Sequence, residues 1–326
     1  MHEIILIIVV LAILFDISNG WNDSANAIAT VVSTRVLSPF QAVALAACMN
    51  ILGAFVSTEV AKTIGEGVVN PAAVTNTVVV AALLTSFLWN ATLTRMGMPI
   101  SCSHALIGAL MGASVAYGGV DILNFSGLKK IFLSLLISPA IGLLLGFFVM
   151  KLLLRLFGAY SPGFLNKYFG RFQLVSSAFM AFSHGSNDAQ KAMGIITLAL
   201  VSDGLLSSME VPFWVILTCA MAMGLGTAMG GWRVIKTLGV NMLKLEPIHG
   251  FAAETTAAMT IIVSSHYGLP VSTTHVIATS IMGVGSTKRF SAVRWGLAGK
   301  IVMAWIFTLP ICFLVGLVIA ELLLHL

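Results

Sequence analysis

Charged side chains are scarce in this sequence. Of its 326 residues, 9% are Asp, Glu, Lys or Arg, whereas 58% are hydrophobic. Soluble domains carry roughly one charged residue in four, so the composition indicates an integral membrane protein. Several apolar runs, such as 131–157 and 293–324, exceed the roughly 20 residues that a membrane-spanning helix needs. The runs are continuous rather than alternating, which excludes an outer-membrane barrel and predicts an all-α polytopic membrane protein.

Cysteine is rare as well, and no CxxC pair is present, so neither a disulfide framework nor a thiolate metal site is indicated. The four cysteines lie far apart, at Cys48, Cys102, Cys219 and Cys312. The residues before the first apolar run lack the basic flank of a cleavable signal peptide, so we expect the first span to begin there. The net charge of +5 comes from basic residues dispersed among short loops. That distribution is typical of a positive-inside bias and indicates no nucleic-acid partner.

One short polar stretch, 183–194, lies between two strongly apolar runs and carries His, Asn, Asp, Gln and Lys. A second stretch, 18–27, repeats its core Gly-x-Asn-Asp-x-x-x-Ala. Ionisable side chains inside a membrane are costly and usually functional, and their duplication argues against chance. Because Gly20 and its polar neighbours interrupt an apolar run, we expect the helix to be broken there, and likewise at the second stretch.

The two polar stretches belong to a longer internal repeat. Pro99–His104 is echoed by Pro270–His275, and Val60–Gly65 by Val234–Gly239. The pairs occur in the same order with nearly constant separation. An internal duplication of the whole chain is therefore predicted.

This duplication divides the chain into two halves. We predict a first repeat over residues 1–157, a cytoplasmic connector over 158–170 and a second repeat over 171–326, together forming one transport domain. Basic residues fall in alternate connectors, which fits an N-terminus outside the cell. If every run crosses once, each half has five crossings, so the second half enters the membrane from the opposite side and both termini lie outside. The pattern predicts an inverted-topology repeat transporter with broken helices or re-entrant hairpins and about 10–12 membrane segments. The number of passes stays open, because it depends on whether the Pro-Ser segments are hairpins.

Each repeated proline segment places three small side chains at the start of a helical run. A helix N-terminus offers unpaired N–H groups and the positive end of its dipole, which suits an anion. Two such starts meeting at a pseudo-twofold axis would cradle a tetrahedral oxyanion. Plain N-capping is the alternative role of these serines and threonines, but the occurrence of the same segment in equivalent places of both halves favours an anion site. The candidate anion ligands are Ser101, Cys102 and Ser103 in the first half and Ser272, Thr273 and Thr274 in the second.

The paired Asn-Asp sequences suit small cations, because carboxylate and amide oxygens are hard ligands. A cation at each pair would offset the charge of a divalent anion, which cannot cross a bilayer unaided. Lys191 stands where the first half has Asn26, and it is either a counterion to Asp188 or Asp23 or a direct anion ligand. Glu254 has no acidic counterpart in the first half and is assigned to a further cation or a proton. The candidate cation ligands are Asn22, Asp23, Asn26, Asn187, Asp188 and Glu254.

These motifs resemble those of the inorganic phosphate transporter (PiT) family, the sodium-dependent phosphate symporter group. Gly20–Ala27 and Gly185–Lys191 resemble its two hallmark sequences, and Pro99–His104 and Pro270–His275 resemble its Pro-x-Ser-x-x-His segments. The resemblance covers essentially the whole chain. It implies an inverted-repeat symporter that moves inorganic phosphate with a cation, usually as a homodimer, in the cell membrane.

By position, the resemblance also implies cation sites at the two Asn-Asp pairs and phosphate contacts at 101–103 and 272–274. To the phosphate contacts we add Gln190 and Lys191 of the second hallmark. We expect sodium as the coupling ion, with proton coupling, metal–phosphate cargo or a sulfate permease as alternatives. An intramembrane enzyme using His184 is disfavoured, since no HExxH motif or nucleophile elbow is present, and no cofactor other than the coupling ions is expected.

Overall fold

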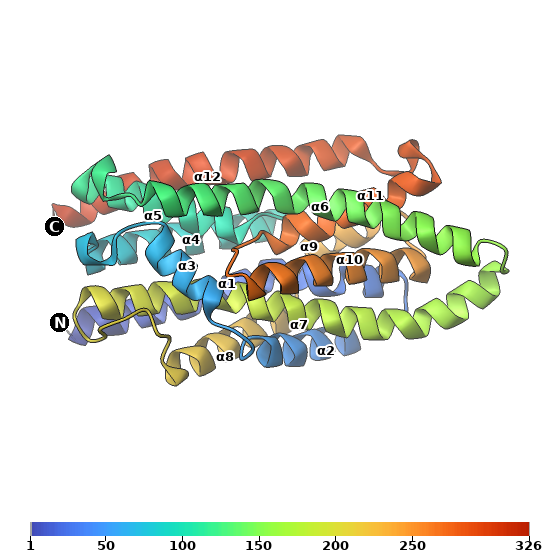
Figure 1. The fold of residues 1–326 in the computed structure, drawn as a ribbon, viewed down its shortest axis with the longest axis horizontal. Helices are drawn as coiled ribbons and strands as arrows, with labels where there is room; N and C mark the ends of the chain where they lie inside the picture. The colour runs from blue at the N-terminus through green and yellow to red at the C-terminus, as the bar shows by residue number, and fades with distance from the viewer. Residues whose placement is uncertain (1, 326) are drawn as a thin grey trace.

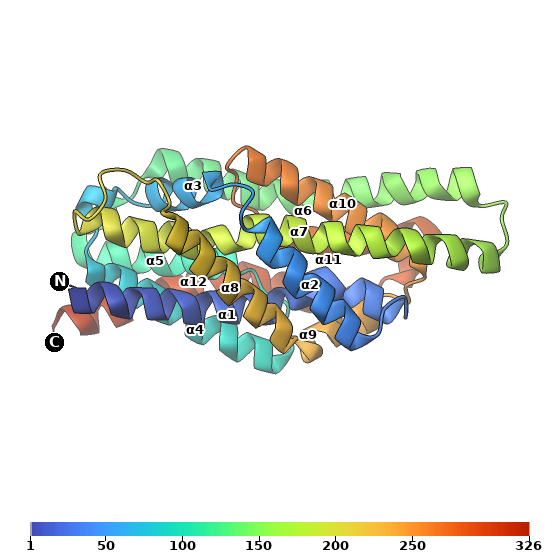
Figure 2. The same cartoon turned by 90° about the horizontal axis from the view of Figure 1, so that it is seen from below.

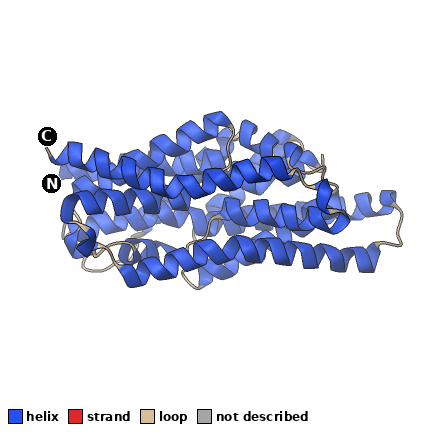
Figure 3. Ribbon diagram, turned by 90° about the horizontal axis from the view of Figure 1, so that it is seen from above, coloured by secondary structure: helices blue, strands red, loops and turns tan. Residues whose placement is uncertain are grey.

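The computed structural model describes residues 2–325, and these residues form helices and no strands (Figure 3). The all-α prediction is therefore confirmed. The helices of the first half are α1 (His2–Ser33), α2 (Pro39–Gly53), α3 (Glu59–Gly67), η1 (Pro71–Ala73), α4 (Asn76–Met96), α5 (Cys102–Gly118), η2 (Val120–Ile122) and α6 (Phe125–Phe157). Those of the second half are α7 (Pro162–Ser202), α8 (Phe213–Met229), α9 (Trp232–Lys236), η3 (Thr237–Asn241), α10 (Pro247–His266), α11 (Thr273–Lys288), η4 (Phe290–Ala292) and α12 (Trp295–Leu324).

Four helices of the described chain, α1, α4, α6 and α12, are long and apolar enough to cross a membrane. Two further spans arise if each sharply bent pair is counted as one, since α2 and α3 meet at 71° and α8 meets α9 with η3 at 63°. Helix α7 is longer than any of these, but its polar centre lowers its hydropathy. The protein is thus a multi-span helical membrane protein with broken helices, while the predicted 10–12 segments stay a prediction.

The breaks do not lie where the sequence suggested. Both polar stretches are helical throughout, so the predicted interruptions at Gly20 and at the second stretch are wrong. The glycines serve close packing instead. A Cβ added at Gly20 would lie 2.5 Å from the carbonyl oxygen of Met223 in α8, and one at Gly185 would collide with the carbonyl oxygen of Asn50 in α2. Glycine here lets two backbones touch, and the helix continues through it.

Most of the predicted connector between the halves is helical. Helix α6 ends at Phe157, as expected, but α7 begins at Pro162, so residues 162–170 of the predicted connector are helical. Ser161 caps this helix by accepting a hydrogen bond from the amide of Phe164, and proline follows at the first helical position, where its missing N–H has no cost. The non-helical link covers only residues 158–161.

The order of elements repeats between the halves. Each half has a long helix carrying one Asn-Asp pair, a bent pair, a further helix, a short serine-capped helix, a 3₁₀ turn and a long helix with an internal proline, Pro139 or Pro310. In Figure 1, α1 runs away from the end that carries both termini, whereas α7 runs toward it; α6 and α12 are opposed in the same way. Equivalent helices of the two halves therefore point in opposite directions.

The two halves are interlocked rather than side by side. Helix α5 of the first half packs along α12 of the second, and α11 packs along α6. Helix α1 lies against α8, and α2 against α7 (Figure 2). A Cβ at Gly108 would lie 2.5 Å from the carbonyl oxygen of Leu309, which shows how closely α5 and α12 approach. Neither half has a complete core of its own, and the centre of the molecule is built by both.

A buried polar centre shared by both halves

The short helices α5 and α11 both begin at the centre of the molecule. Ser101 caps α5 by accepting a 3.2 Å hydrogen bond from the amide of His104, and Ser272 caps α11 through the equivalent 3.3 Å bond from the amide of His275. The two starts are neighbours, because the His104 and His275 rings lie 4.8 Å apart. The hydroxyl of Ser103 also donates to the carbonyl oxygen of Val271, just before α11, at 3.0 Å. Two serine-capped helix starts thus meet in the interior.

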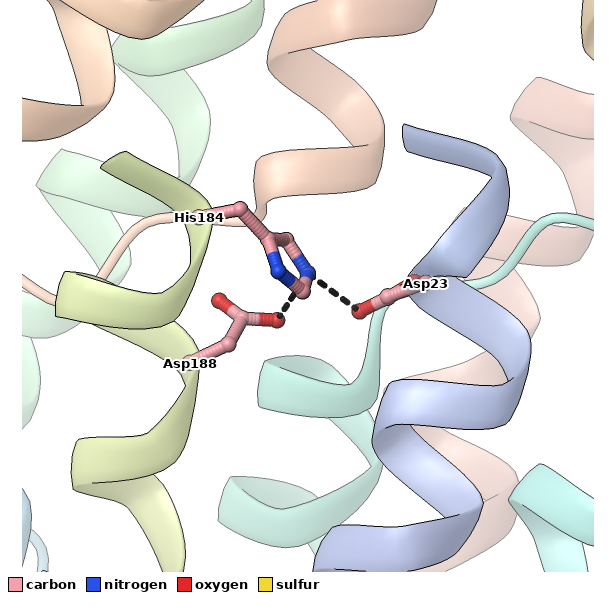
Figure 4. Close-up of side chains that lie close together, drawn as sticks. All are labelled: Asp23, His184 and Asp188. Carbon is pink, nitrogen blue, oxygen red and sulfur yellow. Dashed lines mark ion pairs between the residues drawn. The ribbon is translucent and has the colours of Figure 1, made fainter. Parts of the chain in front are cut away.

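The Asn-Asp acids of the two halves are brought together at this point. Asp23 of α1 and Asp188 of α7 both face His184, whose Nε2 lies 4.0 Å from Asp23 Oδ2 and 3.4 Å from Asp188 Oδ2 (Figure 4). One oxygen of each acid and one histidine nitrogen fall within 4.8 Å of one another. All three side chains are at most 1% exposed. His184 was not among the predicted site residues, although its place four residues before Asp188 puts both on one face of α7.

The threonines at the start of α11 connect the acids to the helix starts. Thr274 donates to Asp23 Oδ1 at 2.8 Å, and Thr273 donates to Asp188 Oδ2 at 3.2 Å. The Asn26 amide donates to both hydroxyls, at 3.0 Å to Thr274 and 3.3 Å to Thr273. Residues predicted as cation ligands and residues predicted as anion ligands therefore form one hydrogen-bonded network.

Lys191 is a counterion within this network. Its Nζ lies 2.8 Å from Asp188 Oδ2, and the side chain is only 1% exposed. The equivalent residue of the first half, Asn26, carries no charge, so Asp23 has no lysine of its own. Of the two acids that the sequence offered as partners of Lys191, Asp188 and Asp23, the lysine forms its ion pair with Asp188.

The asparagines of the pairs are held by their nitrogens. Asn22 donates to Thr94 Oγ1 at 2.8 Å, and Asn187 donates to Ser265 Oγ at 2.8 Å, each partner lying near the end of an equivalent helix, α4 or α10. The amide oxygens of Asn22, Asn26 and Asn187 are buried without a hydrogen-bond partner among the described residues. The carboxylate oxygen Oδ1 of Asp188 is in the same state. Buried oxygens without donors are costly, and a hard cation is the ligand they fit.

Gln190 differs from its predicted place among the phosphate ligands. Its Oε1 accepts the amides of Val60 and Ala61 at 2.8 and 3.0 Å, and its Nε2 donates to the carbonyl oxygen of Ser186 at 2.5 Å. It thus caps the first turn of α3 and fixes that helix to α7. In the other half, the hydroxyl of Ser24 accepts the amide of Gly231 at 2.7 Å and holds the start of α9.

The first-half anion candidates are also used differently from those of the second half. Ser101 is the cap and Ser103 binds a carbonyl oxygen, so neither hydroxyl donates to an acid. Cys102 is buried at the first position of α5. The threonines of α11 contribute the hydroxyls that reach the acids.

Glu254 lies outside the centre, in a polar cluster of its own. Its carboxylate accepts hydrogen bonds from Thr30 at 2.5 Å, from Gln173 at 3.0 Å and from Ser176. Thr30 lies seven residues beyond Asp23 on α1, which corresponds to roughly 10 Å along the helix axis. The structure therefore separates Glu254 from the other predicted cation ligands.

Comparison with known proteins agrees with this architecture. Residues 19–316 match the model of the phosphate transporter family. A protein of Bacillus subtilis named "Probable low-affinity inorganic phosphate transporter" is 46% identical over 314 residues, covering 95% of this chain and 94% of its own length. A protein of the same name from Rhizobium meliloti is 45% identical over 311 residues, covering 95% and 93%.

A solved structure titled "The sodium-dependent phosphate transporter" superimposes with a TM-score of 0.93, covering 99% of this chain and 100% of its own, at 24% sequence identity. At that identity the likeness establishes the fold. The family match and the relatives establish more, since both span nearly the whole chain and name the same cargo. The chain belongs to the phosphate transporter family, and it is a membrane transporter of phosphate rather than an enzyme.

Proposed function

We propose that this protein is a secondary active symporter that imports inorganic phosphate together with sodium ions across the cell membrane. The observation that carries the proposal is the single buried network in which acids from both halves meet hydroxyls at a helix start. Such a centre offers hydrogen-bond donors to an oxyanion and oxygen ligands to cations within a few ångströms. A transporter that moves a divalent anion with cations needs both.

Phosphate would bind between the starts of α5 and α11. The donors there are the amides of the first helical turns, which have no acceptor within their own helix, and the side chains that follow the capping serines. Lys191 adds a buried positive charge, 2.8 Å from Asp188. We assign phosphate to Ser101, Cys102, Ser103, Ser272, Thr273, Thr274 and Lys191, and leave out Gln190 because its amide is fully engaged by backbone.

Sodium would be held by oxygens that have no donor in the folded chain. Asn22, Asn26 and Asn187 each present an amide oxygen of this kind, and Asp188 presents one carboxylate oxygen. Asp23 completes the set, because its negative charge lies opposite that of Asp188 across His184. Two sodium ions would balance a divalent phosphate. Glu254, in its separate cluster, is assigned to a further coupling ion, either sodium or a proton.

The proposed orientation places both termini outside and the connector between the halves in the cytoplasm, with the protein as a homodimer of inverted repeats. Both termini lie at one end of the molecule in Figure 1, and the link between α6 and α7 lies at the other. Basic residues gather near that second end. Arg35, Lys167 and Arg171 line a cavity of about 440 Å³, and Lys244 and Arg294 help line one of about 610 Å³. A positive cytoplasmic face fits this arrangement.

The test is uptake of radiolabelled phosphate into proteoliposomes with the sodium gradient and the proton gradient imposed separately. We expect uptake against a phosphate gradient when sodium is high outside, and no stimulation when choline replaces sodium. A flat response to sodium with strong acceleration by a proton gradient would overturn sodium coupling and leave phosphate transport in place. An excess of unlabelled sulfate tests the sulfate alternative, and we expect it not to compete.

A second candidate cargo, a divalent metal carried with phosphate, is favoured by one observation. Asp23, His184 and Asp188 each offer a ligand atom within 4.8 Å of the others, and imidazole with carboxylates suits Mn²⁺ or Zn²⁺. This reading predicts that ⁵⁴Mn²⁺ enters proteoliposomes only when phosphate is present. Phosphate uptake that is unaffected by removing divalent metals would exclude it.

A further inference from the structure

A buried carboxylate outside the central network has no hydrogen bond. Asp16 of α1 is 0% exposed, and neither of its oxygens has a hydrogen-bond partner among the described residues. It lies seven residues before Asp23, roughly 10 Å along the helix toward the end that carries the termini. A bare carboxylate without donors is among the most costly groups to bury, and more so in a membrane. The folded chain by itself does not account for it.

Two asparagines near Asp16 are left in the same state. All side-chain nitrogen and oxygen atoms of Asn19 in α1 and Asn90 in α4 are buried without hydrogen-bond partners, and both residues are 0% exposed. Asn19 follows Asp16 by three residues and so lies on the same face of α1. Its amide is beside the carboxylate, but no hydrogen bond of ordinary geometry joins them.

The packing of α1 on α4 brings Asn90 to the level of Asn19. The hydrogen bond from Asn22 to Thr94 fixes the register of the two helices. Both run from the end with the termini toward the centre (Figure 2), so one turn back along each leads from this pair to Asn19 and Asn90. Asn90 of α4 thus lies at the level of Asn19, while Asp16 lies one turn further along α1 on the side that faces α7 and α8. The three side chains carry four unpartnered oxygens, two from Asp16 and one from each asparagine.

Glu254 shows what a self-sufficient buried carboxylate looks like in this protein. It accepts hydrogen bonds from Thr30, Gln173 and Ser176, and so its charge is met by donors of the chain. Asp16 accepts no such hydrogen bond from residues 2–325, and no cation of these residues forms an ion pair with it, since Lys191 is paired with Asp188. The titratable groups that face Asp16 are His184, Asp188 and Lys191 on α7 and Cys219 on α8.

We propose that Asp16, Asn19 and Asn90 form an additional binding site for a small monovalent cation, sodium, beside α1 where this helix faces α4 and α7. A carboxylate and two amide oxygens are hard ligands of the kind that small cations prefer. The bound ion would neutralise Asp16 and satisfy the amides, and it would lie between the central network and the end that carries the termini. The inference rests on the proposed sodium coupling, and it adds a sodium ion that neither Asn-Asp pair holds.

The test counts sodium ions. Equilibrium binding of ²²Na⁺ is measured on purified protein in detergent at saturating phosphate, for the natural sequence and for Asp16→Asn. We expect Asp16→Asn to bind one sodium ion fewer per chain. Its sodium dependence of phosphate uptake should show a Hill coefficient lower by about one, the number expected when one of several cooperating ions is lost. Asp121→Asn, the same change at an exposed residue of η2, is the matched control and should behave as the natural protein.

A second variant tests the site independently of the charge that Asp16→Asn removes. Asn90→Leu keeps the volume but removes one ligand oxygen, and we expect the sodium concentration for half-maximal uptake to rise at least about fivefold. Unchanged sodium counts in both variants, with sodium-driven uptake intact, would overturn this site alone. A natural protein that binds no sodium yet takes up phosphate with protons would overturn the site together with sodium coupling. An altered pH profile with an unchanged sodium count would assign Asp16 to a proton and overturn the sodium site.

Discussion

The two central acids occupy equivalent places in the two halves and have unequal partners. Asp188 has the Lys191 ammonium at 2.8 Å and the His184 ring at 3.4 Å, whereas Asp23 has a threonine hydroxyl and a more distant histidine. Three residues after each acid stands a different side chain, Asn26 in one half and Lys191 in the other. The repeat preserves position but not charge. One half carries its own counter-charge three residues after the acid, while the other carries a neutral amide there.

The largest effect should follow from removing either acid. Asp23→Asn and Asp188→Asn should each abolish sodium-driven phosphate uptake, because each deletes a negative charge that would hold a coupling ion. Uptake into proteoliposomes is the measurement, with correct insertion checked by size-exclusion chromatography. Full transport with natural sodium dependence in either variant would contradict the role of that acid.

Stability should separate the two acids where transport does not. Asp188→Asn leaves the Lys191 ammonium buried without its carboxylate, a change that typically costs about 3–5 kcal/mol. Asp23→Asn leaves no lysine unpaired and should unfold at nearly the natural temperature. Thermal unfolding in detergent measures both. The double variant Asp188→Asn with Lys191→Met should recover most of the lost stability and none of the transport. Equal destabilisation by Asp23→Asn and Asp188→Asn would show that the counter-charge is not what distinguishes the halves.

The two helix starts should contribute unequally to phosphate binding. Thr274 of α11 reaches Asp23, whereas the hydroxyl of Ser103 in α5 is committed to the carbonyl oxygen of Val271. Thr274→Ala should therefore weaken phosphate binding by about 1–3 kcal/mol, the usual cost of a lost hydrogen bond to a charged group. Ser103→Ala should have the smaller effect. Equilibrium binding of labelled phosphate at fixed sodium gives both values, and the reverse order would place the anion nearer to α5.

The smallest effects concern the residues that hold α3 and α9, the second helices of the two bent pairs. Gln190→Leu leaves the amides of Val60 and Ala61 without their acceptor and should lower the free energy of unfolding by about 1–3 kcal/mol. Ser24→Ala removes one such bond, to Gly231, and should cost about 1 kcal/mol. Chemical unfolding measures the free energy of unfolding of both variants, and titration with phosphate measures their phosphate affinity. A large loss of phosphate affinity in Gln190→Leu would return this residue to the phosphate site.

The repeated motifs could be recognised in the sequence because they are local, and the binding roles assigned to them stay predictions. The duplication of the Asn-Asp pairs and of the serine-capped starts is visible in the residues, and the structure brings Asp23, Asp188 and Thr274 into one network. What failed depended on partners far along the chain. The role of Gly20 is set by a backbone on α8, roughly 200 residues away, so a packing glycine looked like a helix break.

Two further roles were hidden for the same reason. Gln190 caps amides 130 and 129 residues before it, which no pattern near Gln190 announces. His184 links two acids of which only Asp188 is on its own helix. Local patterns could indicate which residues are costly to bury. Which of them touch depends on how α1, α7 and α11 meet.

The exchange of short helices between the halves bears on how the protein is made. Helix α5 ends at Gly118, but α12, along which it packs, begins at Trp295, 177 residues later. At roughly 5–20 residues per second, the ribosome needs on the order of 10–35 s to deliver that partner. Throughout this interval the glycine-lined face of α5 has only lipid or other proteins of the insertion machinery against it. A nonsense mutation that removes only α12 would therefore leave α5, nearly 200 residues upstream of the lesion, without the helix along which it packs.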